Sequence, residues 1–380
     1  MRILVFGLSS NKGGVESFLA NYCKAILGMR PDIIFDFLVI DEIPECFRFL
    51  ESSGCRFHVV PNRISHPIRY VRGIDSVLGE SEYDAVWYNA CTLSDVTLLQ
   101  KAKGKVPLRI VHAHSSSYMG NVANRLLHDF HKRYITQCAN GFFACSEDAA
   151  RFMYPRNVLN EGRVEVVPNG IQTDSFRFDS GVRNRVRARF GWLEQNVVIY
   201  VGRLNAEKNP LFAVKVYEVL KGLLPSTRLV LVGDGPLRED VKKDISNRNL
   251  EKSISVLGSR SDVNELMMAA DMFIMPSVFE GFGLSFVEAQ ASGLICAVSS
   301  SVPDAAFLTE TSKALPLDCG AAVWADYLVN ARKPSDEERR DASQLVARAG
   351  YDIRACANRL ARTFDAMVDR RRSDDAPSVR

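Results

Sequence analysis

The chain has 380 residues, of which 47% are hydrophobic and 24% charged, and a formal net charge of +3 at pH 7. This length favours about two domains, and the composition excludes a disordered or membrane-spanning chain. The small net charge argues against a nucleic-acid partner, and nine scattered cysteines without a Cys-x-x-Cys pair indicate reduced thiols, a cytoplasmic location and no zinc site.

Short apolar runs alternate with helical patterns from the N-terminus onward. The first run is followed by polar residues and glycines without a small-residue cleavage site, so we interpret it as a strand and not as a signal peptide. β-Branched and aromatic runs of this length predict parallel strands in βαβ units, and their restart at residue 197 predicts two doubly wound α/β domains. The polar, Arg-rich stretch between them reads as a connection with one exposed helix. The predicted strands are 2–8, 35–40, 56–60, 83–89, 108–114, 141–146 and 164–169, then 197–202, 228–233, 253–258, 271–276 and 294–299.

Unusual residues follow several of these strands, where ligands bind in open α/β sheets. Gly13 and Gly14 follow the first strand and let the backbone approach a ligand, although a plain strand-to-helix turn explains them equally well. His112 and His114 share one face at the end of strand 108–114. A histidine at a strand end is more often structural, and His114, nearer the loop, is the better functional candidate.

Two cations follow the first strand of the second half. Arg203 and Lys208 lie five residues apart in a loop and suit a diphosphate clamp, while a solvated loop is the alternative. The turn at 233–236 carries glycines and a proline and is interpreted as structural.

The segment 276–293, PSVFEGFGLSFVEAQASG, combines acids with a Gly-Phe-Gly turn. Each glycine costs about 1 kcal/mol inside a helix, so we expect a loop that ends in a helix beginning near Gly283. The free amides of Gly283, Leu284 and Ser285 then suit a phosphate.

Two glutamates flank this turn and would repel a phosphate if they pointed at it. They suit hydroxyl groups instead, because carboxylates accept hydrogen bonds from them. A sugar nucleotide fits both needs, with Glu288 on the ribose diol and Glu280 on the transferred sugar.

These motifs together resemble glycosyltransferase family 4, retaining enzymes with the GT-B fold of two facing Rossmann-like domains and an interdomain cleft. The resemblance implies an acceptor-binding domain at 1–175, a nucleotide-sugar domain at 176–350, and a segment 351–380 whose helix packs back on the first domain before a frayed tail. The motifs that carry it are GG-V-E (13–16), HAH (112–114), VVPNGI (166–171), GRL-x-x-EKN (202–209), VGDGPL (232–237) and E-G-F-G-L-x-x-x-E-A-x-x-x-G (280–293).

The resemblance also implies roles for individual residues. The catalytic set lies around the reaction centre and the departing diphosphate, and the donor-binding set contacts phosphate, ribose, sugar or base. The expected catalytic residues are Arg203, Lys208, Glu280 and His114; the expected donor-binding residues are Gly13, Gly14, Phe282, Gly283, Leu284, Ser285 and Glu288. Arg260 is added to the donor-binding set from its position after a strand, at 258–261, where we expect the base, and not from the resemblance. One departure follows Gly293, where the family often has paired glycines and a glutamate but this chain reads SSSVPDAAFLTE.

The implied reaction is retaining transfer of a hexosyl or N-acetylhexosaminyl group from a nucleotide diphosphate sugar, commonly a UDP-sugar, to a saccharide or lipid-linked saccharide acceptor. Capsule and exopolysaccharide synthesis are the expected settings. No Asp-x-Asp occurs to hold a metal, so we expect metal independence and no cofactor. A sugar-nucleotide epimerase is one alternative, although it needs no acceptor; a two-lobed solute-binding protein is another, although such proteins are exported.

A basic window covers residues 101–133, with seven Lys and Arg against one acid. Its second part predicts a helix with Val122, Leu126, Leu127, Phe130 and Tyr134 at helical spacing beside several cations. This helix could rest on the anionic inner face of a membrane as a peripheral contact. The alternative is an ordinary amphipathic helix that packs this apolar stripe on its own sheet.

Overall fold

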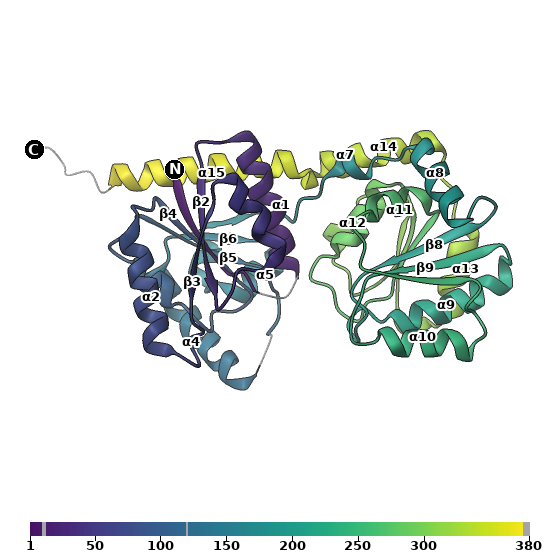
Figure 1. Cartoon of the computed structure of the whole chain (residues 1–380), viewed down its shortest axis with the longest axis horizontal. Coiled ribbons are helices and arrows are strands. Elements are labelled where there is room, and N and C mark those ends of the chain that lie inside the picture. The colour runs from purple at the N-terminus through teal and green to yellow at the C-terminus, as the bar shows by residue number, and fades with distance from the viewer. Residues whose placement is uncertain (10–12, 119–120, 375–380) are drawn as a thin grey trace, which may run out of the picture. The chain divides into compact units, whose positions relative to one another are not determined.

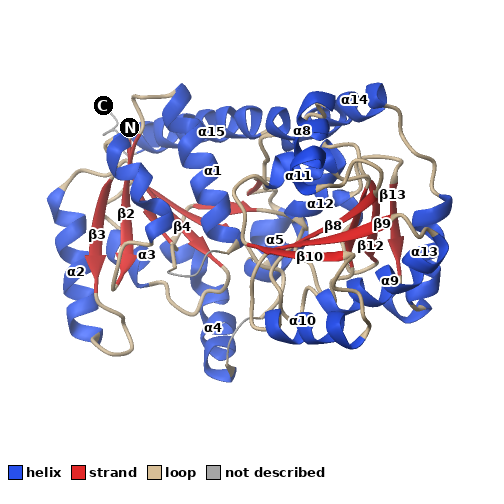
Figure 2. Ribbon diagram, turned by 45° about the vertical axis from the view of Figure 1, so that its right-hand side comes forward, coloured by secondary structure: helices blue, strands red, loops and turns tan. Residues whose placement is uncertain are grey.

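The computed structural model describes residues 1–9, 13–118 and 121–374, and the chain forms two compact units (Figure 1). One consists of Met1–Gly170 with Ile353–Arg380, and the other of Ile171–Asp352. Each contains one parallel sheet with helices on both faces, as Figure 2 shows in red and blue. Within the described ranges, no helix has the length and apolar character needed to cross a bilayer.

The first unit has a seven-stranded sheet in the order β3-β2-β1-β4-β5-β6-β7. Successive residues of β1 alternate between two cores: Ile3 packs on the side of α1 and α15, and Leu4 on the side of α2 to α5. The elements are β1 (Arg2–Phe6), α1 (Gly14–Met29), β2 (Ile34–Ile40), a 3-10 helix (Glu45–Ser53), β3 (Arg56–Val60), α2 (Pro67–Glu80), β4 (Ala85–Ala90), α3 (Thr97–Ala102), β5 (Leu108–Ala113), α4 (Val122–Cys138), β6 (Gly141–Ala144), α5 (Glu147–Met153), α6 (Arg156–Asn160), β7 (Val164–Val166) and α15 (Ile353–Asp374).

The second unit has a six-stranded sheet in the order β10-β9-β8-β11-β12-β13. Val197 and Ile199 of β8 face the core under α8, α11 and α12, and Val198 faces the core under α9, α10 and α13. Both faces are covered, which explains the continuous apolar runs. The elements are α7 (Thr173–Phe176), α8 (Ser180–Phe190), β8 (Asn196–Val201), α9 (Pro210–Leu223), β9 (Thr227–Val232), α10 (Arg238–Asn247), β10 (Ile254–Gly258), α11 (Val263–Ala269), β11 (Met272–Met275), α12 (Leu284–Ala291), β12 (Ile295–Ser299), 3-10 helices at Asp304–Ala306 and Leu317–Cys319, β13 (Ser312–Leu315), α13 (Ala321–Asn330), α14 (Asp336–Val346) and a π-helical turn (Ala347–Tyr351).

The last helix returns to the first unit. Cys356, Leu360, Phe364 and Val368 recur every four residues along α15 and are buried in the core that α1 shares. The helix continues to Asp374, within the segment 351–380 that the resemblance assigns to it.

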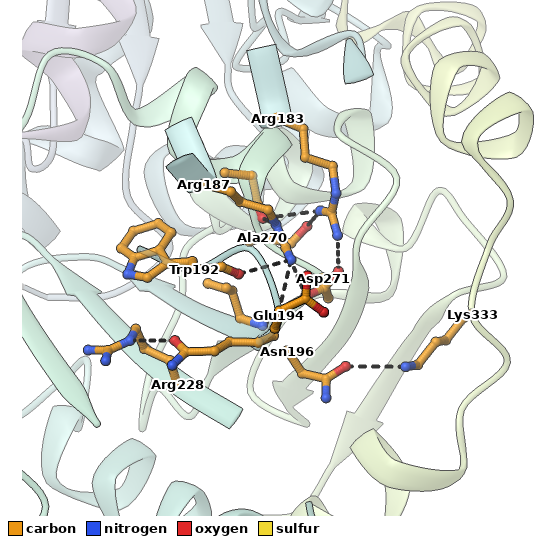
Figure 3. A network of polar contacts seen from close by, with 12 residues as sticks. Arg183, Arg187, Trp192, Glu194, Asn196, Arg228, Ala270, Asp271 and Lys333 are labelled. Carbon is orange, nitrogen blue, oxygen red and sulfur yellow. Dashed lines mark hydrogen bonds and ion pairs between the residues drawn. The ribbon is translucent and has the colours of Figure 1, made fainter. Parts of the chain in front are cut away.

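The Arg-rich stretch after Gly170 is more than an exposed connection, which corrects that part of the sequence interpretation. Arg183 and Arg187 project from α8 onto Asp271, at 2.5 and 2.6 Å (Figure 3). Both also donate to backbone carbonyls at the end of α11, where the helix dipole favours cations. The two arginines therefore fasten α8 to the second sheet.

Helix α4 does not bury its apolar stripe, so the alternative in which this stripe packs on the helix's own sheet is wrong. Val122 is 74% exposed, Leu126 65% and Phe130 55%, whereas His128 and Ile135 are the residues that α4 buries. The apolar stripe of α4 therefore lies at the surface and outside the core.

Candidate active site

The loop after β8 carries the two predicted cations. The buried Tyr200 hydroxyl lies 3.1 Å from the Arg203 carbonyl oxygen and 3.3 Å from that of Lys208, so it can donate to both ends of the loop. The Lys208 amide donates to Asn205 Oδ1 at 3.0 Å. Arg203 is exposed, and none of the described residues forms an ion pair with its guanidinium. The loop thus holds one free and one engaged cation.

A second loop packs closely on this one. A Cβ at Gly233, whose φ is +134°, would lie 1.9 Å from the Gly202 carbonyl oxygen, and a Cβ at Gly235 would lie 2.4 Å from that of Leu204. Only glycine permits these approaches. The structural interpretation of the 233–236 turn is therefore confirmed.

Glu280 meets Lys208 at the carboxyl end of β11. Lys208 Nζ lies 2.6 Å from Glu280 Oε2, and the Ser277 hydroxyl donates to Oε1 at 2.7 Å. The Glu280 side chain is 4% exposed and that of Lys208 29%, so the pair is poorly solvated. The residues expected at the diphosphate and at the transferred sugar are thus in direct contact.

The serine-rich stretch that begins at Ser299, where the chain departs from the family pattern, contacts the segment that carries Glu280. The hydroxyls of Ser299 and Ser301 lie 2.5 and 2.9 Å from the Ser277 carbonyl oxygen and 2.6 Å from each other. Ser277 and Ser299 are buried. The substituted loop therefore holds the segment that carries Glu280, a role that sequence reasoning missed.

Helix α12 begins at Leu284, after Gly283 with φ +82°, as the sequence predicts. In the described chain no group accepts from the amides of Leu284 and Ser285, so they are free for an anion. The Phe282 ring stacks on the ring of Tyr351, with centroids 5.1 Å apart.

Glu288 lies on α12 in a half-buried position. Burial raises the pKa of its carboxyl to about 7. No described residue donates a hydrogen bond to this carboxylate. It is therefore an unpartnered acceptor whose charge changes near neutral pH.

Arg260 is already occupied. Its guanidinium contacts both carboxylate oxygens of Asp262, at 2.7 and 2.5 Å. A contact from Arg260 to a nucleotide base needs this pair to open.

The loop after β1 is held by a residue to which the sequence assigned no role. Glu16 is buried in the first turn of α1, and its carboxylate accepts from the amide and hydroxyl of Ser9 and from the Gly13 amide at 2.7–3.0 Å. Gly14 has open space where a Cβ would stand. The acid in the GG-V-E motif was the available signal for this turn.

His114 and His112 lie at the end of β5 with their rings stacked, 4.2 Å between centroids. His114 Nε2 contacts Asn89 Oδ1 at 2.9 Å, and Phe18 from α1 packs its ring edge-on against His114 at 4.8 Å. Burial lowers the pKa of His114 to about 3, so the ring is neutral. The structure therefore places His114 and the Gly13–Gly14 turn in the first unit, and Arg203, Lys208 and Glu280 in the second.

Comparisons with known proteins place each half of the chain. Residues 12–175 match the model of Glycosyltransferase Family 4, and residues 182–313 match that of Glycosyl transferases group 1. EpsF of Bacillus subtilis (strain 168), which bears the name of a glycosyltransferase, is 28% identical over 380 residues that cover 97% of both chains. The UDP-Gal:alpha-D-GlcNAc-diphosphoundecaprenol alpha-1,3-galactosyltransferase of Escherichia coli is 29% identical over 53% of this chain and 60% of its own length.

Solved structures agree on the fold. HepE of Anabaena, in complex with UDP and glucose, superposes with a TM-score of 0.74 at 18% identity and covers 96% of this chain and 100% of that one. Two parallel sheets in two units, one family model on each half and a full-length relative lead to one conclusion. The chain combines a Glycosyltransferase Family 4 domain at residues 12–175 with a group 1 glycosyltransferase domain at residues 182–313, and it has the GT-B fold.

Proposed function

We propose that the protein transfers a sugar from a UDP-sugar to a lipid-linked saccharide with retention at the anomeric carbon, in the synthesis of an extracellular polysaccharide. The observation that carries this proposal is the contact between Lys208 and the buried Glu280. Glu280 lies four residues before Leu284, the first residue of α12, whose amide is free among the described residues. A nucleotide diphosphate sugar needs cations and amides on its phosphates and a carboxylate on its sugar hydroxyls. Lys208, the α12 amides and Glu280 offer these three groups.

The chemistry follows from where charge develops. Breaking the bond between the sugar and the β-phosphate leaves negative charge on the diphosphate, so Arg203, Lys208 and the α12 amides would stabilise the leaving group. The acceptor hydroxyl then bonds to the anomeric carbon and passes its proton to an oxygen of the departing diphosphate. Glu280 orients the sugar or shields its developing positive charge, while Glu288 accepts from the ribose hydroxyls.

Named relatives support the donor and acceptor classes. The Escherichia coli relative uses UDP-Gal and a diphosphoundecaprenol-linked sugar, and a Xanthomonas campestris relative, 25% identical over 58% of this chain, uses GDP-mannose and a diphosphopolyprenol-linked cellobiosyl unit. Both names describe alpha products, which supports retention. Their donors differ in nucleotide and in sugar, so the choice of UDP rests on the likeness to the UDP-bound structure.

A lipid-linked acceptor requires the protein to meet a membrane, and α4 offers a surface for this contact. Its exposed apolar residues, including Leu126 and Phe130, lie on a helix that also carries Arg125 and Arg133. This combination suits insertion between anionic headgroups. Replacing Leu126 and Phe130 by Glu should abolish flotation with anionic vesicles, and equal flotation of the variant and the native protein would contradict the assignment.

The proposal is tested with a panel of sugar nucleotides in thermal melts, because a ligand of the native state raises Tm by mass action. We expect one UDP-sugar to raise the Tm of the native protein, with EDTA present, and not that of Lys208→Ala. If no nucleotide sugar shifts the native protein at millimolar concentration, the assigned donor site is wrong.

A further inference from the structure

The hydrogen bond between Asn89 and His114 indicates which ring nitrogen of the histidine carries a proton. Asn89 lies near the end of β4 and His114 just beyond β5, and these strands are neighbours in the sheet. The His114 amide also donates to the Ala90 carbonyl at 3.0 Å, so the backbone holds the two side chains beside each other.

The orientation of the Asn89 amide is set by its surroundings. Asn89 Nδ2 lies 3.2 Å from the Trp87 carbonyl oxygen and 3.4 Å from that of Phe6. An NH₂ group can donate to these two acceptors, whereas a rotated amide would place its oxygen against both. Asn89 is 2% exposed, so Oδ1 is the atom that faces His114.

The histidine tautomer follows from this orientation. Asn89 Oδ1 only accepts, so His114 Nε2, at 2.9 Å, must carry the proton, and Nδ1 is left with a lone pair. The neighbouring ring follows the same rule, because Trp87 Nε1 only donates and lies 3.3 Å from His112 Nδ1. Both histidines therefore carry their proton on Nε2.

Packing keeps His114 in this state. Its ring stacks on that of His112 at 4.2 Å and contacts that of Phe18 at 4.8 Å, and Phe18 also contacts His112 at 4.9 Å, so the three rings form one packed cluster. Burial holds its pKa near 3, so a second proton does not occupy Nδ1 at neutral pH. No described residue donates to Nδ1, which is thus free to accept from a ligand.

We propose that Asn89 is a positioning residue that fixes the Nε2–H tautomer of His114 and so presents Nδ1 as an acceptor for a hydroxyl group of the bound sugar substrate. This inference rests on the proposed function for the identity of the ligand. It assigns His114 to hydrogen-bond acceptance and not to acid catalysis.

The tautomer is measured without substrate, so a failure of the proposed function does not affect the reading. In long-range ¹H–¹⁵N spectra of the full chain labelled with [¹⁵N]histidine, His114 should show one protonated nitrogen, Nε2, with His114→Gln giving the assignment. Asn89→Ala should give mixed tautomers. Trp87→Phe removes the hydrogen bond to His112 and some core packing but keeps the Trp87 carbonyl that Asn89 contacts, so it should leave the His114 tautomer unchanged. An Nδ1–H form in the native protein would overturn the proposal, whether or not the variants fold.

A double-mutant cycle tests the functional part. Asn89→Ala should lower kcat/KM by ~10-fold, within the range of coupling between side chains in direct contact. In the His114→Ala background the same substitution should change kcat/KM by less than ~2-fold. Equal losses in both backgrounds would show that Asn89 acts independently of His114 and would overturn the proposal.

Discussion

Replacing Glu280 by Gln should tighten the binding of UDP while it lowers turnover, because Lys208 has to exchange Glu280 for the donor diphosphate. Their charged atoms lie 2.6 Å apart, which at an effective dielectric constant of about 20 corresponds to a gross attraction of about 6 kcal/mol. Desolvation of the two groups offsets most of this, and double-mutant studies of close pairs leave one to several kcal/mol. A residual coupling of about 1.4 kcal/mol would give a tenfold gain in UDP affinity.

Isothermal titration calorimetry with UDP distinguishes the residues. We expect Glu280→Gln to bind UDP ~10-fold more tightly than the native protein and Lys208→Ala to bind it more weakly. In the double variant Lys208→Ala/Glu280→Gln the gain should disappear, since no lysine is released. If Glu280→Gln binds UDP no better than the native protein, Lys208 is not a phosphate ligand for which Glu280 competes, and the reasoning fails.

Three further predictions concern charge, space and pH. Asp271→Ala leaves Arg183 and Arg187 without their ion-pair partner and should lower the free energy of unfolding by ~3–5 kcal/mol in denaturant melts. The control Glu239→Ala removes an exposed ion pair and should cost under ~1 kcal/mol. Similar losses in both variants would show that Asp271 does not fasten α8 to the second sheet. Gly233→Ala should destabilise by well over ~1 kcal/mol because of the Gly202 carbonyl, while Gly28→Ala, in open space on α1, should stabilise by ~0.5–1 kcal/mol; a tolerated Gly233→Ala would contradict the close approach. UDP affinity should rise between about pH 6 and about pH 8, as Glu288, with a pKa of about 7, ionises and becomes a stronger acceptor, and then level off. Glu288→Gln should remove that slope, and an unchanged slope would assign it to another group.

The sequence predicts much of the fold because buried parallel strands are apolar on both faces. All twelve predicted strands are present, with ends shifted by a few residues. The missed strand is β13, Ser312–Leu315, which reads SKAL and lies at the sheet edge with Lys313 and Ala314 exposed. An edge strand buries little, so its sequence carries no apolar run.

In helix α4 the sequence has an apolar pattern, but the structure does not bury it. Its apolar spacing fits a core-facing helix, yet His128 and Ile135 supply the contact and the stripe lies in solvent. Spacing along a helix identifies residues that share a face, but it does not identify what that face contacts.

The expected site residues came from local motifs, and their supports did not. Asn89 and Ser299 are far in sequence from the groups they contact, His114 and Ser277, and only the sheet brings them together. The pairing of Lys208 with Glu280 was likewise absent from the sequence reading, because the two lie 72 positions apart.

The most direct test of the account is a transfer assay with the purified full-length chain, a panel of UDP-sugars, a diphosphopolyprenyl saccharide in anionic vesicles, and EDTA. The account predicts one extended saccharide whose new anomeric centre, read from its ¹H–¹³C coupling, has the configuration of the donor, and none with Lys208→Ala. An inverted centre, or a product that forms equally well with Lys208→Ala, would contradict it.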